Sequence, residues 1–272
     1  MSNNFGVAAA DIASDGRSFI ELRDIGKTFE TKSGDVEAIG QINLSVRQNQ
    51  FIAIVGPSGC GKSTLLKIVA GLVAPSSGLV RIYDDNERPL LGMVFQHPAL
   101  LPWRTVLANI LLPTEIVGQP REEAAERARG LLQLVRLADF ASKYPSELSG
   151  GMQMRAALCR ALICEPSLLL MDEPFGALDA MTREDLSLEL LRIWQRKPKT
   201  VLFVTHSISE AILLADQVVV ISSRPGHVVE TVDIDIGRPR GIGHTESQAF
   251  RDYLFHIRSL IVSDQQRPQA ES

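Results

Sequence analysis

Short apolar runs recur along most of this chain, and their patterns predict two kinds of β-strand. Residues 19–25 and 42–46 alternate apolar with polar positions, which is typical of half-buried antiparallel strands. Residues 51–55 are apolar almost throughout and predict a central strand buried on both faces. Helical patterns separate most of the remaining runs, so the sequence predicts an α/β fold with a mainly parallel sheet. These remaining strand candidates are residues 91–95, 168–171, 201–204 and 218–221.

Between Gln96 and Ser149 the pattern becomes helical. Residues 122–135 carry apolar side chains at helical spacing, and Pro145 ends the helical pattern. We therefore expect a helical subdomain, at about residues 97–165, inserted into the sheet. The two ends of the chain are small, polar and without periodicity, so we expect flexible segments on either side of one folded unit. The expected boundaries are 1–18 for the first segment, 19–262 for the folded unit and 263–272 for the tail.

Composition narrows the possible partners. The 272 residues include 28 Lys and Arg against 32 Asp and Glu, and this balance provides no positive field to attract nucleic acid. The three cysteines, Cys60, Cys159 and Cys164, lack metal-ligand spacing and predict reduced thiols in a cytoplasmic protein. No stretch reaches the roughly 20 apolar residues that span a bilayer, and the first residues lack the pattern of a signal peptide. Any membrane role is therefore expected to depend on a partner.

A glycine-rich segment lies between the predicted strand 51–55 and an apolar helical segment. It fits the G-x-x-x-x-G-K-[ST] pattern of a phosphate-binding loop in the required strand-to-helix context. Backbone N–H groups would face the β-phosphate of ATP, Lys62 would reach the β and γ oxygens, and the Ser63 hydroxyl would bind Mg²⁺. Cys60 is predicted to fill space in the loop rather than to react. The nucleotide-binding residues expected here are Gly56, Pro57, Ser58, Gly59, Cys60, Gly61, Lys62, Ser63 and Thr64.

Two adjacent carboxylates follow the apolar run 168–171. Because the carboxyl ends of parallel strands meet at one edge of a sheet, Asp172 and Glu173 should lie near the phosphate loop. We expect Asp172 to hold Mg²⁺ through water. Glu173 is expected to orient and polarise the attacking water, since phosphoryl transfer leaves the protein mainly positioning and electrostatic tasks.

A second candidate anion site lies at residues 148–151, which read Leu-Ser-Gly-Gly and precede a helical stretch. Ser149 offers a hydroxyl, and Gly150 and Gly151 let backbone N–H groups approach an anion at a helix N-terminus. The same segment also fits an ordinary helix cap, and taken alone it does not distinguish the two. Combined with the phosphate loop, it indicates that one chain carries two half-sites.

The ordered set of motifs resembles that of the ABC (ATP-binding cassette) ATPases over about residues 19–235. The set comprises the phosphate loop, Gln96 after a strand, the 148–151 signature, Asp172 with Glu173, the Ala-Leu-Asp at 177–179, and His206 after a strand. The resemblance implies the P-loop NTPase fold of an ABC cassette, with a mainly parallel core, an antiparallel β subdomain and an inserted helical subdomain.

The resemblance also implies roles for individual residues. Phe29 would stack on adenine, and Asp179 would couple two protomers at the nucleotide. The implied catalytic residues are Glu173, His206, Gln96 and Lys62, with His206 contacting the γ-phosphate. The implied Mg²⁺ ligands are Ser63, Gln96 and, through water, Asp172. One departure is Met152, which follows Gly151 where many family members carry Gln; methionine lacks the side-chain amide of Gln, while the backbone donors and the helix end remain.

Four further segments resemble one branch of the family, the ATPases of nitrate, taurine, aliphatic sulfonate and bicarbonate importers. These segments are residues 95–97, 101–106, 223–226 and 238–240. The resemblance implies a head-to-tail dimer with a second copy or a related cassette, in which ATP lies between one phosphate loop and the other signature. It also implies a transmembrane permease, contacted by the segment containing Leu100, Leu101 and Trp103, and an indirect link to a solute-binding protein. The expected location is the cytoplasmic face of the plasma membrane, attached through the permease.

Two other functions use similar chemistry. One is a nucleic-acid-linked ABC ATPase, but the interval between Gln96 and Ser149 is too short for the long coiled-coil insert of repair proteins. The other is a binding module in which nucleotide only switches conformation. The presence of Glu173 favours hydrolysis over such a switch.

Overall fold

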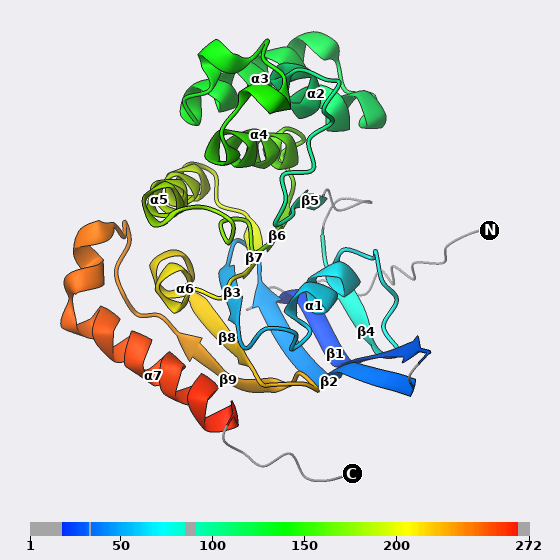
Figure 1. The fold of residues 1–272 in the computed structure, drawn as a ribbon, viewed down its shortest axis with the longest axis vertical. Coiled ribbons are helices and arrows are strands. Elements are labelled where there is room, and N and C mark those ends of the chain that lie inside the picture. Colours follow the sequence, from blue (N-terminus) through cyan, green and yellow to red (C-terminus); the bar gives the residue numbers. More distant parts are fainter. Residues whose placement is uncertain (1–17, 33, 85–90, 266–272) are drawn as a thin grey trace.

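The computed structural model of the protein describes residues 18–32, 34–84 and 91–265 (Figure 1). The predicted flexible segments lie outside these residues for the most part. The strands are β1 Ser18–Thr31, β2 Gly34–Arg47, β3 Phe51–Val55, β4 Ser77–Ile82, β5 Leu91–Val94, β6 Leu168–Asp172, β7 Thr200–Val204, β8 Gln217–Ile221 and β9 Val228–Asp233. The helices are α1 Lys62–Val69, α2 Val106–Val117, α3 Arg121–Leu134, α4 Gly150–Leu162, α5 Ala180–Arg196, α6 Ile208–Leu214 and α7 Gln248–Gln265.

The central sheet has the order β5-β6-β7-β3-β8-β9, with β9 alone antiparallel. Strand β3 lies inside this sheet and is buried along its whole length, as its apolar sequence predicts. Its side chains alternate between two apolar clusters, because successive residues of a strand face opposite sides. Phe51 and Ala53 belong to the cluster that includes α4, α5 and α6, whereas Ile52 and Ile54 belong to the one that includes α1 and β1.

A separate antiparallel sheet has the order β2-β1-β4. Helix α1 packs against β2 on one side and against β6 and β7 on the other, so it joins the two sheets (Figure 1). The predicted α/β fold, with a mainly parallel core and an antiparallel β part, is confirmed. Strands β4 and β9 lack a strong alternating pattern and were not predicted; each is held by its neighbour, β1 or β8.

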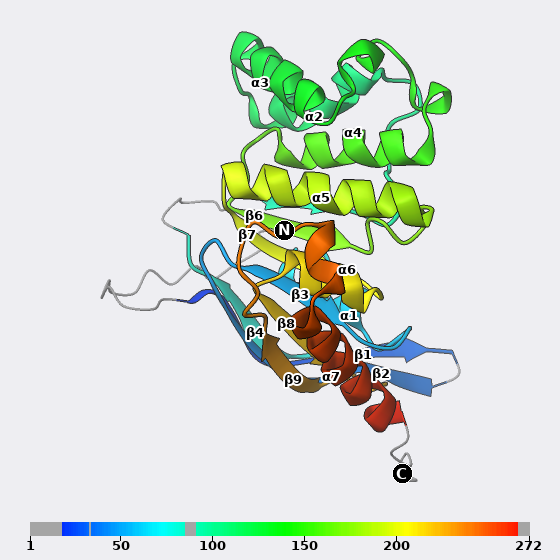
Figure 2. The same ribbon diagram turned by 90° about the vertical axis from the view of Figure 1, so that its left-hand side faces the viewer.

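Helices α2, α3 and α4 form a lobe beyond the strands β5 and β6 (Figures 1 and 2). Thr105 caps the start of α2 by accepting a hydrogen bond from the Ala108 N–H, and Gly118 ends that helix in a left-handed conformation, with φ of 72°. Helix α4 packs against α2, α3, β5 and α5. The lobe therefore rests on the central sheet through α4.

Two predicted boundaries need correction. Ser18 is already part of β1, where it pairs with Arg47. Helix α7 continues to Gln265, so residues 263–265 belong to the folded unit rather than to a tail. Asp264 shows why, because its carboxylate is buried and accepts two hydrogen bonds from Ser223. The other residues of the two predicted flexible segments, 1–17 and 266–272, lie outside the described residues.

Within the described residues, no helix combines the length and the apolar character that crossing a bilayer requires.

Candidate functional site

The phosphate loop connects the end of β3 to the start of α1. Gly61 precedes α1 with φ of 97°, a left-handed conformation that costs a glycine little. A Cβ atom at Gly61 would also lie 2.7 Å from a carbonyl oxygen of β2, so the site has no room for a side chain. The Lys62 ammonium is buried under the loop and donates hydrogen bonds to the carbonyl oxygens of Gly56, at 2.9 Å, and Pro57, at 2.7 Å. The loop is therefore wrapped around its lysine.

Two carboxylates follow at the end of β6, beside the phosphate loop. The Ser63 hydroxyl donates to Asp172 at 2.7 Å, which joins α1 to β6. Burial raises the pKa of the Asp172 carboxyl, and the Ser63 hydrogen bond opposes that rise. Glu173 has φ of 45°, unusual for a residue with a side chain, and its N–H donates to the Val204 carbonyl. This hydrogen bond to β7 holds Glu173 in the turn that directs it away from the strand.

Three polar residues gather around Gly176. The His206 Nδ1 atom lies 3.4 Å from a carboxylate oxygen of Glu173. A Cβ atom at Gly176 would lie 3.3 Å from the His206 ring and 3.7 Å from the amide nitrogen of Gln96. Gln96 follows β5, Glu173 follows β6 and His206 follows β7, so three neighbouring strands deliver these groups to one edge of the sheet.

The turn that carries His206 is fixed by a buried network. The Thr205 hydroxyl donates to Glu210 at 2.6 Å and accepts from the Ser207 N–H at 3.0 Å. Burial raises the pKa of Glu210, while Thr205 and Arg183 favour its charged form. Ser207 in turn caps α6. The ring of His206 is therefore presented by a turn whose polar groups are paired.

A pocket of about 200 Å³ lies over the phosphate loop and includes an aromatic ring from the other sheet. Phe29 of β1 is 38% exposed, and the Lys27 ammonium lies 5.0 Å from the centre of its ring. The Cys60 thiol is buried beneath the loop, which raises its pKa. Its side chain therefore fills space beneath the loop. The pocket is lined by Phe29, Val36, Ala38, Gly59, Gly61, Lys62, Ser63, Thr64, Glu173 and Arg224.

The 148–151 segment forms the start of α4. Ser149 caps the helix by accepting a hydrogen bond from the Met152 N–H at 3.3 Å. A Cβ atom at Gly151 would lie 2.6 Å from the Thr182 methyl group of α5. Asp179 caps α5 through the Thr182 N–H, and its hydrogen bonds to Thr182 lower its pKa. The two helix starts therefore lie side by side, and neither contributes to the lining of the phosphate-loop pocket.

Comparison with known proteins places these features in a family. Residues 39–176 match the ABC transporter family. The chain belongs to this family. It is 40% identical over 257 residues to the taurine import ATP-binding protein of Pseudomonas entomophila, covering 92% of this chain and 98% of that protein. It is 42% identical over 222 residues to the nitrate import ATP-binding protein of Synechocystis, covering 80% of this chain and 83% of that protein.

Solved structures agree with this assignment. The dimeric structure of a bacterial ABC transporter cassette matches with a TM-score of 0.71 and 34% identity, covering 80% of this chain and 100% of that one. The same cassette in a dimeric post-hydrolysis state bound to ADP and Pi matches with a TM-score of 0.69 and 33% identity, with the same coverage. The predicted family, fold and ATPase class are confirmed, and as an ABC cassette the chain binds and hydrolyses ATP.

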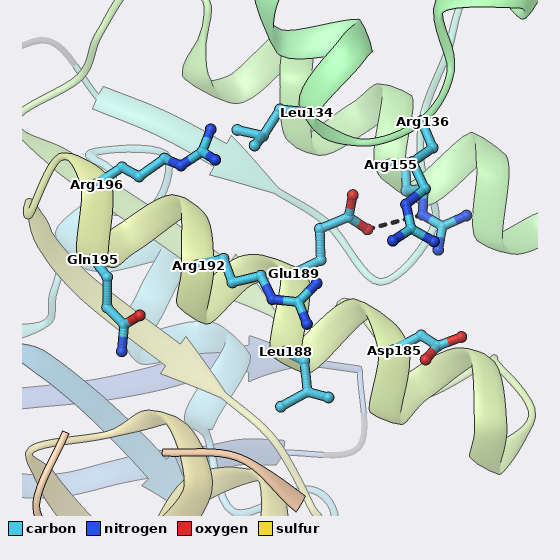
Figure 3. Close-up of a pocket in the computed structure, with 9 residues that line it drawn as sticks. All are labelled: Leu134, Arg136, Arg155, Asp185, Leu188, Glu189, Arg192, Gln195 and Arg196. Carbon is cyan, nitrogen blue, oxygen red and sulfur yellow. Dashed lines mark hydrogen bonds and ion pairs between the residues drawn. The ribbon is translucent and has the colours of Figure 1, made fainter. Parts of the chain in front are cut away.

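The larger pocket of this ABC cassette, of about 520 Å³, lies away from the phosphate loop, between the helical lobe and α5 (Figure 3). Inside it Arg155 of α4 and the buried Glu189 of α5 form an ion pair at 2.9 Å. This ion pair fixes α4 and α5 to each other. It thereby links the helix that starts at the signature to the helix that starts after Asp179. The lining residues are Leu134, Arg136, Arg155, Asp185, Leu188, Glu189, Arg192, Gln195 and Arg196.

The segment after Gln96 is partly exposed. Trp103 is 72% exposed, whereas Leu100 packs against the core and Leu101 is partly buried. Of the three residues expected in the permease-contacting segment, Trp103 is therefore exposed, whereas the two leucines are exposed only in part. Buried Asn109 of α2 holds the segment, because its side chain bonds the N–H and the carbonyl of Leu101 and the carbonyl of Arg104.

Sequence reasoning missed Arg224 as a residue of the nucleotide pocket. In the sequence, the Ser-Arg-Pro-Gly segment at 223–226 stands out only as a feature of one family branch. Arg224 lies 165 positions after Gly59 in the sequence, and it nevertheless donates to the Gly59 carbonyl. The signal available was a cation beside turn-forming Pro and Gly residues, which alone does not point to a site.

Proposed function

We propose that this chain is the ATP-hydrolysing subunit of an importer for a small anion, of the nitrate, taurine, aliphatic sulfonate or bicarbonate type. The class of solute is supported by similarity over most of the chain to taurine and nitrate import ATP-binding proteins. Hydrolysis is supported by one observation above all, which is that Glu173, His206 and Gln96 gather at the edge of the sheet beside the Lys62 pocket.

Each of these side chains has a task in phosphoryl transfer. Lys62 and the loop N–H groups bind the β- and γ-phosphates, and Phe29 stacks on adenine. The Glu173 carboxylate accepts a hydrogen bond from the attacking water, and His206 and Gln96 hold the γ-phosphate and that water in line. The positive φ at Glu173 and the paired turn at His206 support this arrangement, because a fixed geometry reduces the reorganisation needed during reaction.

The residues beside the phosphate loop also fit Mg²⁺. Ser63 and Asp172 offer hard oxygen atoms 2.7 Å apart, and the carbonyl of the Gln96 side chain is a third oxygen donor at the same edge. Few protein ligands are needed, since Mg²⁺ retains waters and takes phosphate oxygens. Held by these residues, the ion would neutralise charge that develops on the phosphates.

The cassette works as a pair. Ser149, Gly150 and Gly151 do not line their own phosphate-loop pocket, so a head-to-tail partner is needed to bring a signature to the nucleotide. Asp179 stands beside the signature, at the position expected of a residue that couples the protomers. The partner is a second copy or a related cassette, and the dimeric structure of a similar cassette supports this.

Trp103 provides a contact for the permease. Its exposed ring follows Gln96 by seven positions, so a movement of Gln96 toward nucleotide can be transmitted to it. The protein is then bound peripherally at the cytoplasmic face of the membrane through the permease, and a solute-binding protein acts on it indirectly. The net charge of −4 supports the exclusion of nucleic acid from the partners.

The test is reconstitution with the permease and solute-binding protein encoded nearest to this chain. We expect ATPase activity in proteoliposomes to rise when the binding protein is loaded with one of nitrate, taurine, an alkylsulfonate or bicarbonate. The matched control is Glu173→Gln in the same complex, which should stay silent with every solute. Failure of the chain to copurify with the permease, or activity unaffected by all four solutes, would contradict the proposal.

The shared site can be tested by mixing two variants in a Glu173→Gln background, which slows hydrolysis. Lys62→Ala removes nucleotide binding, and Ser149→Arg places a bulky cation where the partner's nucleotide would lie. Neither variant alone should form an ATP-dependent dimer in size-exclusion chromatography. Their mixture should form one, because one of its two sites contains both lesions and the other contains none. An ATP-dependent dimer in the Glu173→Gln parent but not in the mixture would refute the head-to-tail arrangement.

A further inference from the structure

The loop between β8 and β9, residues 222–227, packs directly against the phosphate loop. The Arg224 side chain donates to the Gly59 carbonyl through Nη2 at 3.0 Å and through Nε at 3.3 Å. Gly226 hydrogen-bonds through its backbone to β2, where it donates to Ala38 and accepts from Gly40. This β8–β9 loop therefore lies between the phosphate loop and the sheet that carries Phe29.

Some N–H donors of the Arg224 guanidinium have no acceptor among the described residues. Arginine carries five N–H donors, and its Nη1 group makes no hydrogen bond or ion pair with any residue that the structure describes. The side chain lines the same pocket as Phe29 and Lys62. A charged, partly satisfied donor at the rim of a phosphate-binding loop suits an anionic oxygen, since guanidinium and phosphate form short, charge-assisted hydrogen bonds.

A second contact anchors the β8–β9 loop from the other side. Asp264, near the end of α7, is buried and accepts hydrogen bonds on one carboxylate oxygen from the Ser223 N–H at 2.6 Å and the Ser223 hydroxyl at 2.8 Å. Ser222 ties the loop together, because its hydroxyl donates to the Pro225 carbonyl and accepts from the His227 N–H. The backbone that carries Arg224 is thus fixed to the last helix of the chain.

We propose that Arg224 is a further nucleotide-binding residue, which donates to the phosphate groups of bound ATP or ADP, and that Asp264 is its positioning residue. The proposal rests on the nucleotide site proposed above. Arg224 replaces no residue of that site; it adds a cation over Gly59 that Lys62, buried beneath the loop, does not supply. Helix α7 thereby becomes a structural support of the nucleotide pocket.

Binding of a fluorescent ADP analogue measures the effect directly. Arg224→Gln should raise the Kd for nucleotide by about 10- to 100-fold, the range for loss of a charge-assisted hydrogen bond. Arg224→Lys, which keeps the charge but loses the planar donors, should fall between Arg224→Gln and the parent. If Arg224→Gln fails to fold, Arg224→Lys decides alone: a Kd equal to that of the parent overturns the proposal, and a raised Kd supports it.

If Asp264 positions Arg224, replacing Asp264 should weaken nucleotide binding less than replacing Arg224 does. Asp264→Asn keeps the size of the side chain but weakens the two hydrogen bonds from Ser223, so the KM for ATP should rise by a larger factor than kcat falls. The matched control is His256→Gln on the same helix, because His256 pairs with Glu230 of β9 at 2.8 Å rather than with the β8–β9 loop. Asp264→Asn should also add little to the Kd of Arg224→Gln, since both act through one contact. Full additivity of the two would overturn the role of Asp264.

Measuring the nucleotide Kd of Lys62→Ala as well distinguishes a wrong role for Arg224 from a wrong nucleotide site. If Lys62→Ala weakens nucleotide binding and Arg224→Gln does not, the site stands and the role of Arg224 is refuted. If Lys62→Ala leaves the Kd unchanged, the proposed site is wrong and the inference falls with it.

Discussion

Replacing Gly226 by alanine tests whether the β8–β9 loop supports the phosphate loop. A Cβ atom at Gly226 would lie 2.1 Å from the Cys60 carbonyl oxygen, 3.3 Å from the Cys60 carbonyl carbon and 3.2 Å from a methyl group of Ile221. The shortest of these contacts involves backbone on both sides, so no flexible side chain can turn away. The residue lacks a left-handed φ, and the perturbation is therefore one of space and not of backbone strain.

The size of the effect follows from these distances. Cβ contacts under 3.0 Å essentially never occur, so the two backbones must separate by about 1 Å. A displacement of about 1 Å at a catalytic site can lower the rate by about 10²-fold. Overpacking of this kind also costs about 1–3 kcal/mol of unfolding free energy, which lowers the Tm by about 2–4 °C per kcal/mol in a domain of this size.

Three measurements decide the outcome: ATPase turnover, the Kd for a fluorescent ADP analogue, and the Tm. Gly237→Ala is the matched control, because nothing lies within 4 Å of a Cβ atom there and the φ of Gly237 is not left-handed. We expect Gly237→Ala to match the parent in all three measurements. If Gly226→Ala lowers the Tm but leaves turnover and Kd at the parental values, the contact stabilises the fold without positioning the phosphate loop, and the reasoning is refuted.

Further outcomes are expected elsewhere in the molecule. Glu173→Gln should retain nucleotide binding and lower hydrolysis by about 10²-fold or more, whereas a parental rate would exclude Glu173 as the group that orients water. Trp103→Ala should leave the Tm unchanged but reduce copurification with the permease, while the control Trp194→Ala, at a buried ring, should cost about 3–5 kcal/mol of unfolding free energy. The Cys60 thiol should react with maleimide far more slowly in the native protein than in denaturant, because it is buried and its pKa is raised; equal rates would mean that the phosphate loop is open. Asp172→Asn should abolish turnover and yet raise the Tm at pH 7, because burial raises the pKa of this carboxyl and so disfavours its charged form in the folded protein. The gain in Tm over the parent should shrink as the pH falls through the pKa of Asp172 in the folded protein. A lower Tm of the variant at pH 7 would contradict this expectation.

The sequence by itself determined those features that contiguous residues encode. The uninterrupted apolar run of β3 could only be buried on both faces, which places a parallel sheet at the centre of the fold. The phosphate loop is a local structure as well, since the strand before it, its glycines and the helix after it lie within one short segment. The position of the two adjacent carboxylates, Asp172 and Glu173, at a strand end could also be predicted, because they directly follow an apolar run in the sequence.

Only the tertiary structure shows how distant residues come together at the site, whether the family resemblance had assigned them, as for Phe29, or had not, as for Arg224. Phe29 comes from the antiparallel sheet, and Arg224 from a loop beyond β8, yet both line the pocket over Lys62. Their own sequence neighbourhoods show a strand and a turn, and nothing local points either of them toward a nucleotide. The predicted end of the folded unit, at residue 262, falls three residues before the end of α7, because the partner of Asp264, Ser223, lies 41 positions earlier in the chain. Periodicity and motifs report interactions between near neighbours, whereas the pocket is built from contacts across the sheets, whose partners are selected only when the whole core packs.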